Sequence, residues 1–120
     1  MKYNNKKCTF GNLKFDSIKE KDRYIELLAK SQKGEITDLI LQPEFELQEA
    51  FDVPVLSSVG KPKKKRERAI KYVADFQYSE KIGDKTWDVV EDVKGMKTQV
   101  YRLKRKMFLY KYPEYLFRET

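Results

Sequence analysis

Histidine is absent from this sequence of 120 residues, and cysteine occurs once, at Cys8. These absences exclude a structural zinc site, a histidine-based catalytic triad and an intramolecular disulfide, and the lone cysteine favours a reducing, cytoplasmic setting. No apolar run approaches the roughly eighteen residues of a membrane span, so no membrane association is expected. Any acid–base or metal chemistry must therefore rest on carboxylates and lysines.

Proline and glycine are also sparse, at four and five residues, whereas 40% of the chain is hydrophobic and 13% is aromatic. This composition predicts a globular chain, and the length predicts a single domain over residues 1–120. Lysine and arginine number 26 against 19 aspartates and glutamates, which gives a formal charge of +7. A small basic protein is a candidate for binding polyanions, and a nucleic acid such as DNA is the commonest partner of this kind.

The pattern of apolar and turn residues predicts helices and strands in alternation. Residues 15–34 favour a helix, with a capping box from Ser17 to Glu20 and a stop at Gly34. Residues 35–51 are typical of strands on both sides of Pro43. The stretch 53–67 combines proline, glycine, serine and a cluster of basic residues, and it predicts a mobile basic loop.

The second half of the chain predicts a hairpin, a helix and a short strand. Residues 69–80 form one expected strand and 86–94 its returning partner, with the turn at Gly83. A helix is expected over 96–112, with Pro113 ending it, and a last strand over 114–119. The apolar residues of the helix that are expected to face the core are Val100, Leu103, Met107 and Tyr110. This order indicates an α+β (or α/β) domain built on a small mixed sheet flanked by helices.

Two carboxylates and a lysine are expected to meet on the hairpin. Side chains alternate faces along a strand, so Asp92 and Lys94 share one face and Glu91 takes the other. Asp75, in the apolar run VADF, lies across the hairpin and comes close to Asp92 if their faces match. Carboxylate oxygens suit Mg²⁺ or Mn²⁺, and an ammonium can orient a metal-activated water. The alternative is a cross-strand salt bridge without catalytic function.

Two further residues are candidates for the same site. Glu20 shares the core-facing stripe of its helix with Tyr24 and Leu27, where an unpaired carboxylate is costly. A capping glutamate explains it equally well, and the two roles are compatible. Gln42 precedes Pro43 at a strand end, from which its amide can reach a neighbouring site.

Asp75 on one strand, followed by Asp92-Val93-Lys94 on the next, resembles the motif of the PD-(D/E)xK nuclease superfamily, with Ala74 in place of the proline. Glu20 matches the helical acid found in its Holliday-junction resolvases and related phage endonucleases. Through FDSIKEKDRY, LQPEFEL, YVADFQY, VVEDVKG and YRLKRKMF, nearly the whole chain resembles a phage and prophage family of small resolvase-like endonucleases.

The resemblance implies a restriction-endonuclease-like core and a Mg²⁺- or Mn²⁺-dependent endonuclease acting on branched or structured DNA in phage replication, recombination or packaging. Asp75, Asp92 and the Val93 carbonyl would hold the metal. Lys94 would serve the attacking water, and Glu20 would complete the site. Glu91 would be the motif acid if a bulge shifted the register. A homodimer is expected by analogy with resolvases, in the cytoplasm of a bacterial host.

Basic residues supply candidate DNA contacts, although a solvated helix face and a solubilising loop explain them as well. The rival functions are a non-catalytic nucleic-acid-binding accessory protein and a protein-binding module with a degenerate nuclease fold. The predicted DNA-contacting residues are Lys63, Lys64, Lys65 and Arg66 in the basic stretch, and Lys97, Tyr101 and Lys104 after Gly95.

Overall fold

The computed structural model describes residues 8–95 and 97–120, and these form two compact units. The first, which we call the sheet unit, comprises the described residues of the ranges 8–43, 74–97 and 114–120. The second, the ribbon unit, comprises Glu44–Val73 and Thr98–Pro113. The sequence predicted one domain, and the division into two units was not foreseen. The mixed α+β class is confirmed.

A four-stranded mixed sheet forms the centre of the sheet unit, in the order β10-β9-β8-β3. Strands β3 (Ile36–Leu41), β8 (Phe76–Ile82) and β9 (Lys85–Asp92) are antiparallel neighbours, and β10 (Leu116–Glu119) pairs with β9 in parallel. The β8–β9 hairpin turns at Gly83, whose φ of 66° is in the region that glycine tolerates without strain. This hairpin confirms the prediction from alternation.

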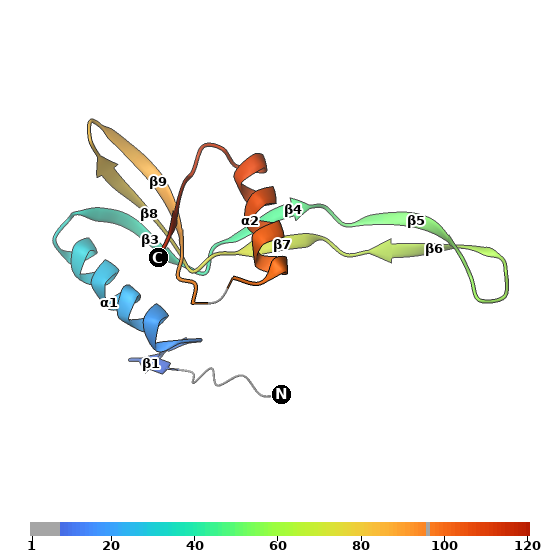
Figure 1. Cartoon of the computed structure of the whole chain (residues 1–120), viewed down its shortest axis with the longest axis horizontal. Coiled ribbons are helices and arrows are strands. Elements are labelled where there is room, and N and C mark those ends of the chain that lie inside the picture. The colour runs from blue at the N-terminus through green and yellow to red at the C-terminus, as the bar shows by residue number, and fades with distance from the viewer. Residues whose placement is uncertain (1–7, 96) are drawn as a thin grey trace. The chain divides into compact units, whose positions relative to one another are not determined.

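Helix α1 (Ile18–Gln32) packs on this sheet, as Figure 1 shows in blue. Its buried Leu27 joins Ile36, Phe76 and Val89 in the core, and the Tyr24 ring stacks 6.4 Å from Phe76. The helix begins after Ser17 and ends before Gly34, as predicted. A short hairpin of β1 (Cys8–Phe10) and β2 (Leu13–Phe15) precedes it and was not predicted.

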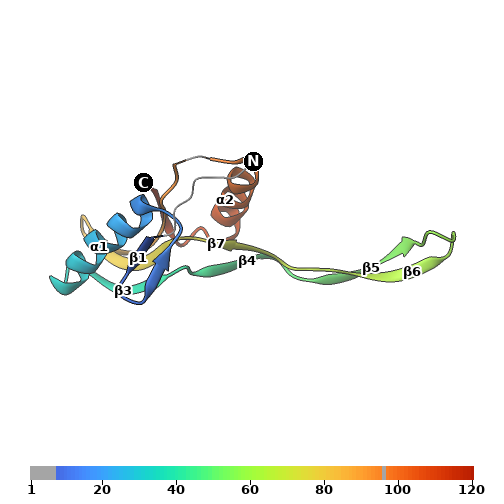
Figure 2. The same ribbon diagram turned by 90° about the horizontal axis from the view of Figure 1, so that it is seen from below.

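The ribbon unit is built from two successive antiparallel pairs and one helix. Strand β4 (Glu44–Gln48) pairs with β7 (Ile70–Val73), and β5 (Phe51–Leu56) pairs with β6 (Pro62–Glu67). Figures 1 and 2 both show the two pairs following one another as a long two-stranded ribbon. Helix α2 (Gln99–Lys111) lies against β4 and β7, where the rings of Phe45 and Phe108 meet at 4.8 Å.

Three expectations about individual elements were wrong. Residues 53–67 form most of a regular hairpin rather than a loop, because Val53 to Leu56 pair residue by residue with Lys65 to Pro62. The strand expected over 69–80 breaks at Ala74 and Asp75, because its halves pair in different sheets. Helix α2 buries Tyr101 and Phe108 rather than the predicted stripe.

Candidate functional site

The β8–β9 hairpin places Asp75 opposite Asp92. Phe76 pairs with Glu91 in the antiparallel register, and continuing that register by one residue sets Asp75 against Asp92. The Asp75 backbone N–H donates to the Glu91 carbonyl at 3.2 Å, which holds the chain in this register just before β8 begins. The break in the strand expected over 69–80 therefore places Asp75, a candidate metal ligand, next to Asp92.

The half-buried Asp75 carboxylate lies beside the carboxylate of Asp92. Its Oδ2 accepts a hydrogen bond from the Val93 N–H at 2.7 Å, and Asp92 is fully buried beside it. The pKa of Asp75 is raised from 3.8 to about 8, mainly by burial, with the charges of Asp92 and Glu20 adding to the increase and the hydrogen bond from the Val93 N–H opposing it. The Asp75 and Asp92 side chains interact directly, and with its raised pKa the Asp75 carboxyl is largely protonated near neutral pH in the absence of a cation.

Lys94 faces the same pair, as alternation along the strand predicted. Its Nζ lies 3.6 Å from Asp92 Oδ1, and its side chain is 28% exposed, so the ammonium reaches solvent. The end of β10 fixes the backbone here. Thr120 N–H donates to the Asp92 carbonyl at 2.9 Å, and Lys94 N–H donates to the Thr120 carbonyl at 3.0 Å. Two hydrogen bonds therefore bracket the Asp92-Val93-Lys94 segment.

Glu20 comes from the first turn of α1 and is buried. Ser17 Oγ caps the helix by accepting from the Glu20 N–H at 3.1 Å, but the Glu20 carboxylate accepts from the backbone of Asp16 rather than from Ser17. Burial and the charge of Asp16 raise its pKa, Lys94 lowers it and Asp92 raises it. Glu20 therefore interacts electrostatically with the Asp92 and Lys94 pair.

A pocket of about 170 Å³ opens at these residues. Glu20, Asp75 and Gln42 all line it, which brings together three of the predicted site residues. Gln42 has a φ of 50°, a left-handed conformation that is uncommon for a residue with a side chain, and its N–H donates to the Asp75 carbonyl at 2.9 Å. Lys14, in strand β2, was missed because the β1–β2 hairpin was not predicted. The other lining residues are Leu13, Phe15 and Leu41.

The donor atoms suit a hard divalent cation better than a soft metal. Asp75, Asp92 and Glu20 offer carboxylate oxygens, the ligand type that Mg²⁺ and Mn²⁺ prefer. Burial is the main cause of the raised pKa of Asp75, and repulsion from Asp92 and Glu20 adds to it; a bound cation would offset both. In the described residues, no three or more Asp, Glu, Cys or His side chains are already gathered closely enough to hold a metal ion. Val93 contributes its N–H to Asp75, whereas its carbonyl was the expected ligand.

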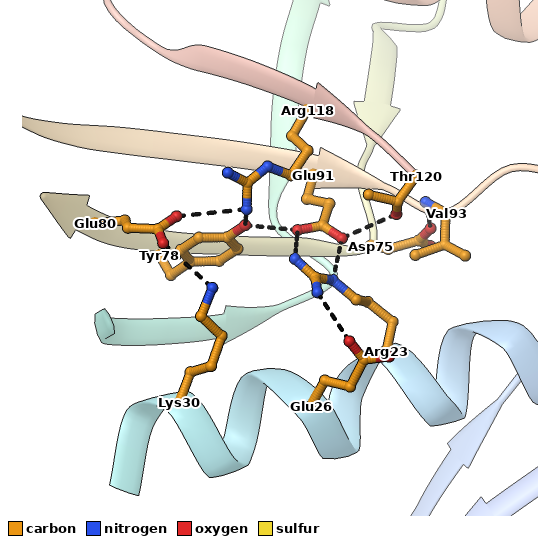
Figure 3. A network of polar contacts seen from close by, with 10 residues as sticks. All are labelled: Arg23, Glu26, Lys30, Asp75, Tyr78, Glu80, Glu91, Val93, Arg118 and Thr120. Carbon is orange, nitrogen blue, oxygen red and sulfur yellow. Dashed lines mark hydrogen bonds and ion pairs between the residues drawn. The ribbon is translucent and has the colours of Figure 1, made fainter. Parts of the chain in front are cut away.

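Glu91 lies in a different environment, which Figure 3 shows in detail. The Arg23 side chain on α1 donates hydrogen bonds to both carboxylate oxygens of Glu91, at 2.6 and 3.0 Å. The Tyr78 hydroxyl donates to it at 2.6 Å and the Thr120 hydroxyl at 2.9 Å. Although burial alone would raise the pKa of Glu91, the hydrogen bonds from Arg23 and Tyr78 lower it overall.

The Glu91 network continues along the sheet. Arg118 on β10 donates to the Tyr78 hydroxyl at 2.9 Å and approaches Glu80 at 3.4 Å, and Lys30 of α1 pairs with Glu80 at 3.2 Å. Glu91 thus connects helix α1 to the sheet through a network of charged and polar side chains. The register between β8 and β9 runs without a shift from Phe76 to Ile82, so Asp92 remains the acid on the side of Lys94.

The predicted DNA-contacting residues differ in their surroundings. Lys64 and Arg66 on β6 are exposed and pair with Asp52 at 3.6 and 3.4 Å, and Lys65 pairs with Glu67 at 3.4 Å. Their neighbour Lys63 is exposed as well. In the sheet unit, Lys97 pairs with Glu119 at 2.8 Å. On α2, Tyr101 is buried and unsuited to contacting DNA, and Lys104 is half-buried.

The architecture and the site define a mixed α+β protein with two neighbouring carboxylates, one of them fully buried, beside a lysine. The chain belongs to the family described as "Protein of unknown function (DUF1064)", whose model matches residues 1–118. Searches of the curated proteins and of the solved structures give no significant match. In the part of the chain that the structure describes, neither helix is long and apolar enough to cross a membrane.

Proposed function

We propose that this chain is a metal-dependent endonuclease that hydrolyses phosphodiester bonds in branched or otherwise structured DNA. The observation that carries the proposal is the pairing of the half-buried Asp75 with the fully buried Asp92, with the Lys94 ammonium 3.6 Å from Asp92. Two carboxyl groups withdrawn from water are costly unless they bind something, and the pKa of Asp75, raised mainly by burial, reflects that cost. The resemblance to the PD-(D/E)xK nucleases, and to a restriction-endonuclease-like core, points to the same chemistry.

Each residue has a role that its position supports. Asp75 and Asp92 would hold Mg²⁺ or Mn²⁺, with Glu20 contributing directly or through water from across the pocket. The ion, when bound, supplies Lewis-acid stabilisation of the phosphate and lowers the pKa of a bound water. Lys94, half-buried and in reach of solvent, would orient that water or stabilise the developing negative charge. Gln42 and Lys14 line the pocket and would contact a substrate phosphate or ordered water.

Binding of the DNA backbone is assigned to the exposed cations of β6. Lys63, Lys64, Lys65 and Arg66 are consecutive and therefore project from both faces of the ribbon. Contacts to phosphates would give affinity without base preference and with strong salt dependence. The setting that fits this function is the cytoplasm of a bacterial host, with the protein encoded by a phage or prophage and acting as a homodimer as resolvases do.

A cleavage assay tests the proposal. Four-way junction DNA and linear duplex of the same sequence are incubated with the protein and with Mg²⁺, Mn²⁺ or EDTA. We expect metal-dependent cleavage of the junction, abolished in Asp92→Ala and Lys94→Ala, with both variants still binding DNA. Binding without cleavage on any substrate and with any metal would instead support the alternative, a non-catalytic DNA-binding accessory protein. Absence of DNA affinity at moderate salt would favour the protein-binding module.

A further inference from the structure

Helix α2 carries two apolar stripes on opposite sides. The first contains Tyr101 and Phe108, and it packs against the ribbon, where Phe108 lies 5.2 Å from the Tyr72 ring. The second contains Val100, Leu103, Met107 and Tyr110, which are three or four residues apart and so also share a side of the helix. A helix that is apolar on two sides is normally covered on both.

The second stripe is open in the ribbon unit. Val100 is 63% exposed, Leu103 60% and Tyr110 90%. Beside them lies an apolar groove of about 540 Å³, lined by Leu47, Leu103, Met107 and Tyr110 together with Lys106 and Lys111. Clustered exposed apolar side chains of this kind mark interaction sites rather than ordinary surface.

The charges around the groove favour an acidic occupant. Helix α2 has no acidic residue, and its basic residues are Arg102, Lys104, Arg105, Lys106 and Lys111. The acids of β4 are exposed at alternate positions, whereas its Phe45 and Leu47 are buried, so the acids face away from α2. A second copy of this chain, docked with its groove on the groove, would therefore bring like charges together.

The apolar lining favours a protein over a nucleic acid. Bases stack on aromatic rings, and Tyr110 is the one aromatic residue of this lining, whereas Leu47, Leu103 and Met107 are flexible aliphatic side chains that suit the apolar residues of a helix. We propose that this groove binds an acidic amphipathic helix of a partner protein. Apolar residues of the partner at helical spacing would enter the groove, and its carboxylates would pair with Lys106 and Lys111. This interaction does not depend on nuclease activity.

A peptide titration on the full chain tests the inference. The probe is a labelled 16-residue synthetic peptide with leucines at helical spacing and glutamates elsewhere, and the control peptide has the same composition in scrambled order. Fluorescence anisotropy should show saturable binding of the amphipathic peptide and binding at least about tenfold weaker for the scrambled one. Equal binding of both peptides, or of neither, would overturn the inference.

Substitutions inside and outside the groove test where the peptide binds. Leu103→Asp should abolish it, and Val59→Ser should leave it unchanged, because Val59 is 77% exposed in the β5–β6 turn and outside the groove. The double reversal Lys106→Glu and Lys111→Glu keeps the apolar lining and should weaken binding about tenfold or more, which guards against misfolding of Leu103→Asp. Two results would contradict the inference: a wild-type dimer that Leu103→Asp dissociates, or displacement of the peptide from the groove by single-stranded DNA.

Discussion

Glu91 and Asp92 are neighbours in the chain and both are fully buried, yet they serve different partners. Glu91 is satisfied by Arg23, Tyr78 and Thr120, so its charge is neutralised by the fold. Asp92 faces another carboxylate and a lysine that reaches solvent. Strand alternation explains the division, because adjacent side chains point to opposite faces of the sheet. Glu91 therefore stabilises the structure, whereas Asp92 belongs to the proposed metal site.

Replacing Glu91 by glutamine should destabilise the fold. The variant Glu91→Gln removes the buried ionic partner of the half-buried Arg23 guanidinium and leaves only the exposed Glu26, and we expect a loss of about 2–4 kcal/mol in the free energy of unfolding. Urea denaturation followed by circular dichroism measures it. Glu26→Gln is the matched control, because Glu26 pairs with the same arginine while 65% exposed, and it should cost less than about 1 kcal/mol. Equal losses in the two variants would contradict the anchoring role of Glu91.

The pKa of Asp75 predicts an unusual dependence of stability on pH. Its pKa is about 8 in the folded chain against 3.8 for an ordinary aspartate, so between these values the folded state binds more protons than the unfolded state. The contribution of Asp75 to the free energy of unfolding is therefore greatest at low pH and falls as the pH rises toward 8. Urea unfolding in EDTA between pH 5 and 9 should show this decline.

Asp75→Asn provides the comparison for this pH effect. The amide is close in shape to the protonated acid and can still accept from the Val93 N–H through its oxygen. The decline with pH should therefore be much reduced in the variant, and the variant should be at least as stable as the wild type at pH 9. An identical decline in both proteins would show that another group is responsible.

At the scale of elements, the hairpin, α1 and the last strand could be predicted because their signals are local. Each of these signals depends only on residues close together in the sequence. They are the apolar–polar alternation over residues 76–92, the turn at Gly83 and the helix cap at Ser17. The break at Ala74 and Asp75 has no local signal, since YVADF alternates like a continuous strand. It arises from pairing with β4 on one side and with β3 and β9 on the other.

The ribbon and α2 show why other element predictions failed. Proline, glycine and lysine in residues 53–67 indicated a loop, but the cross-strand register and the pairing of Asp52 with Lys64 and Arg66 support strands instead. Helix α2 has two apolar stripes, and periodicity alone could not tell which is buried. The aromatic contacts of Phe108 with Phe45 and Tyr72 decide it.

The cations of β6 should dominate the salt dependence of DNA binding. Replacing Lys63 and Lys65 by glutamine removes two phosphate contacts, so the slope of log affinity against log salt should become shallower by about two. Fluorescence anisotropy with duplex DNA at salt concentrations from about 50 to about 300 mM measures the slope. The control is the exposed pair Lys33→Gln and Lys81→Gln, which changes the net charge equally in the sheet unit. A similar change in the control would mean that only net charge matters.

At the scale of the whole molecule, the candidate acids and lysine fall within one compact unit, although they are far apart in the sequence. Glu20, Gln42, Asp75, Asp92 and Lys94 all belong to the sheet unit. Composition could not predict that these residues belong to one unit and the basic hairpin to the other, because charge is distributed throughout the chain. It follows from which strands pair, and the ribbon unit is left with the basic hairpin and the open face of α2.

We propose that Asp92, and not a nearby acid, forms a divalent metal site with Asp75. Binding of Mn²⁺ to the full chain, followed by electron paramagnetic resonance of the free ion at pH 8, tests it most directly. We predict one site in the wild type, at least tenfold weaker binding in Asp92→Asn, and unchanged binding in Asp88→Asn, since Asp88 is exposed on the same strand and bonded to Ser79. No Mn²⁺ binding by the wild type, or equal binding by Asp92→Asn, would contradict the account.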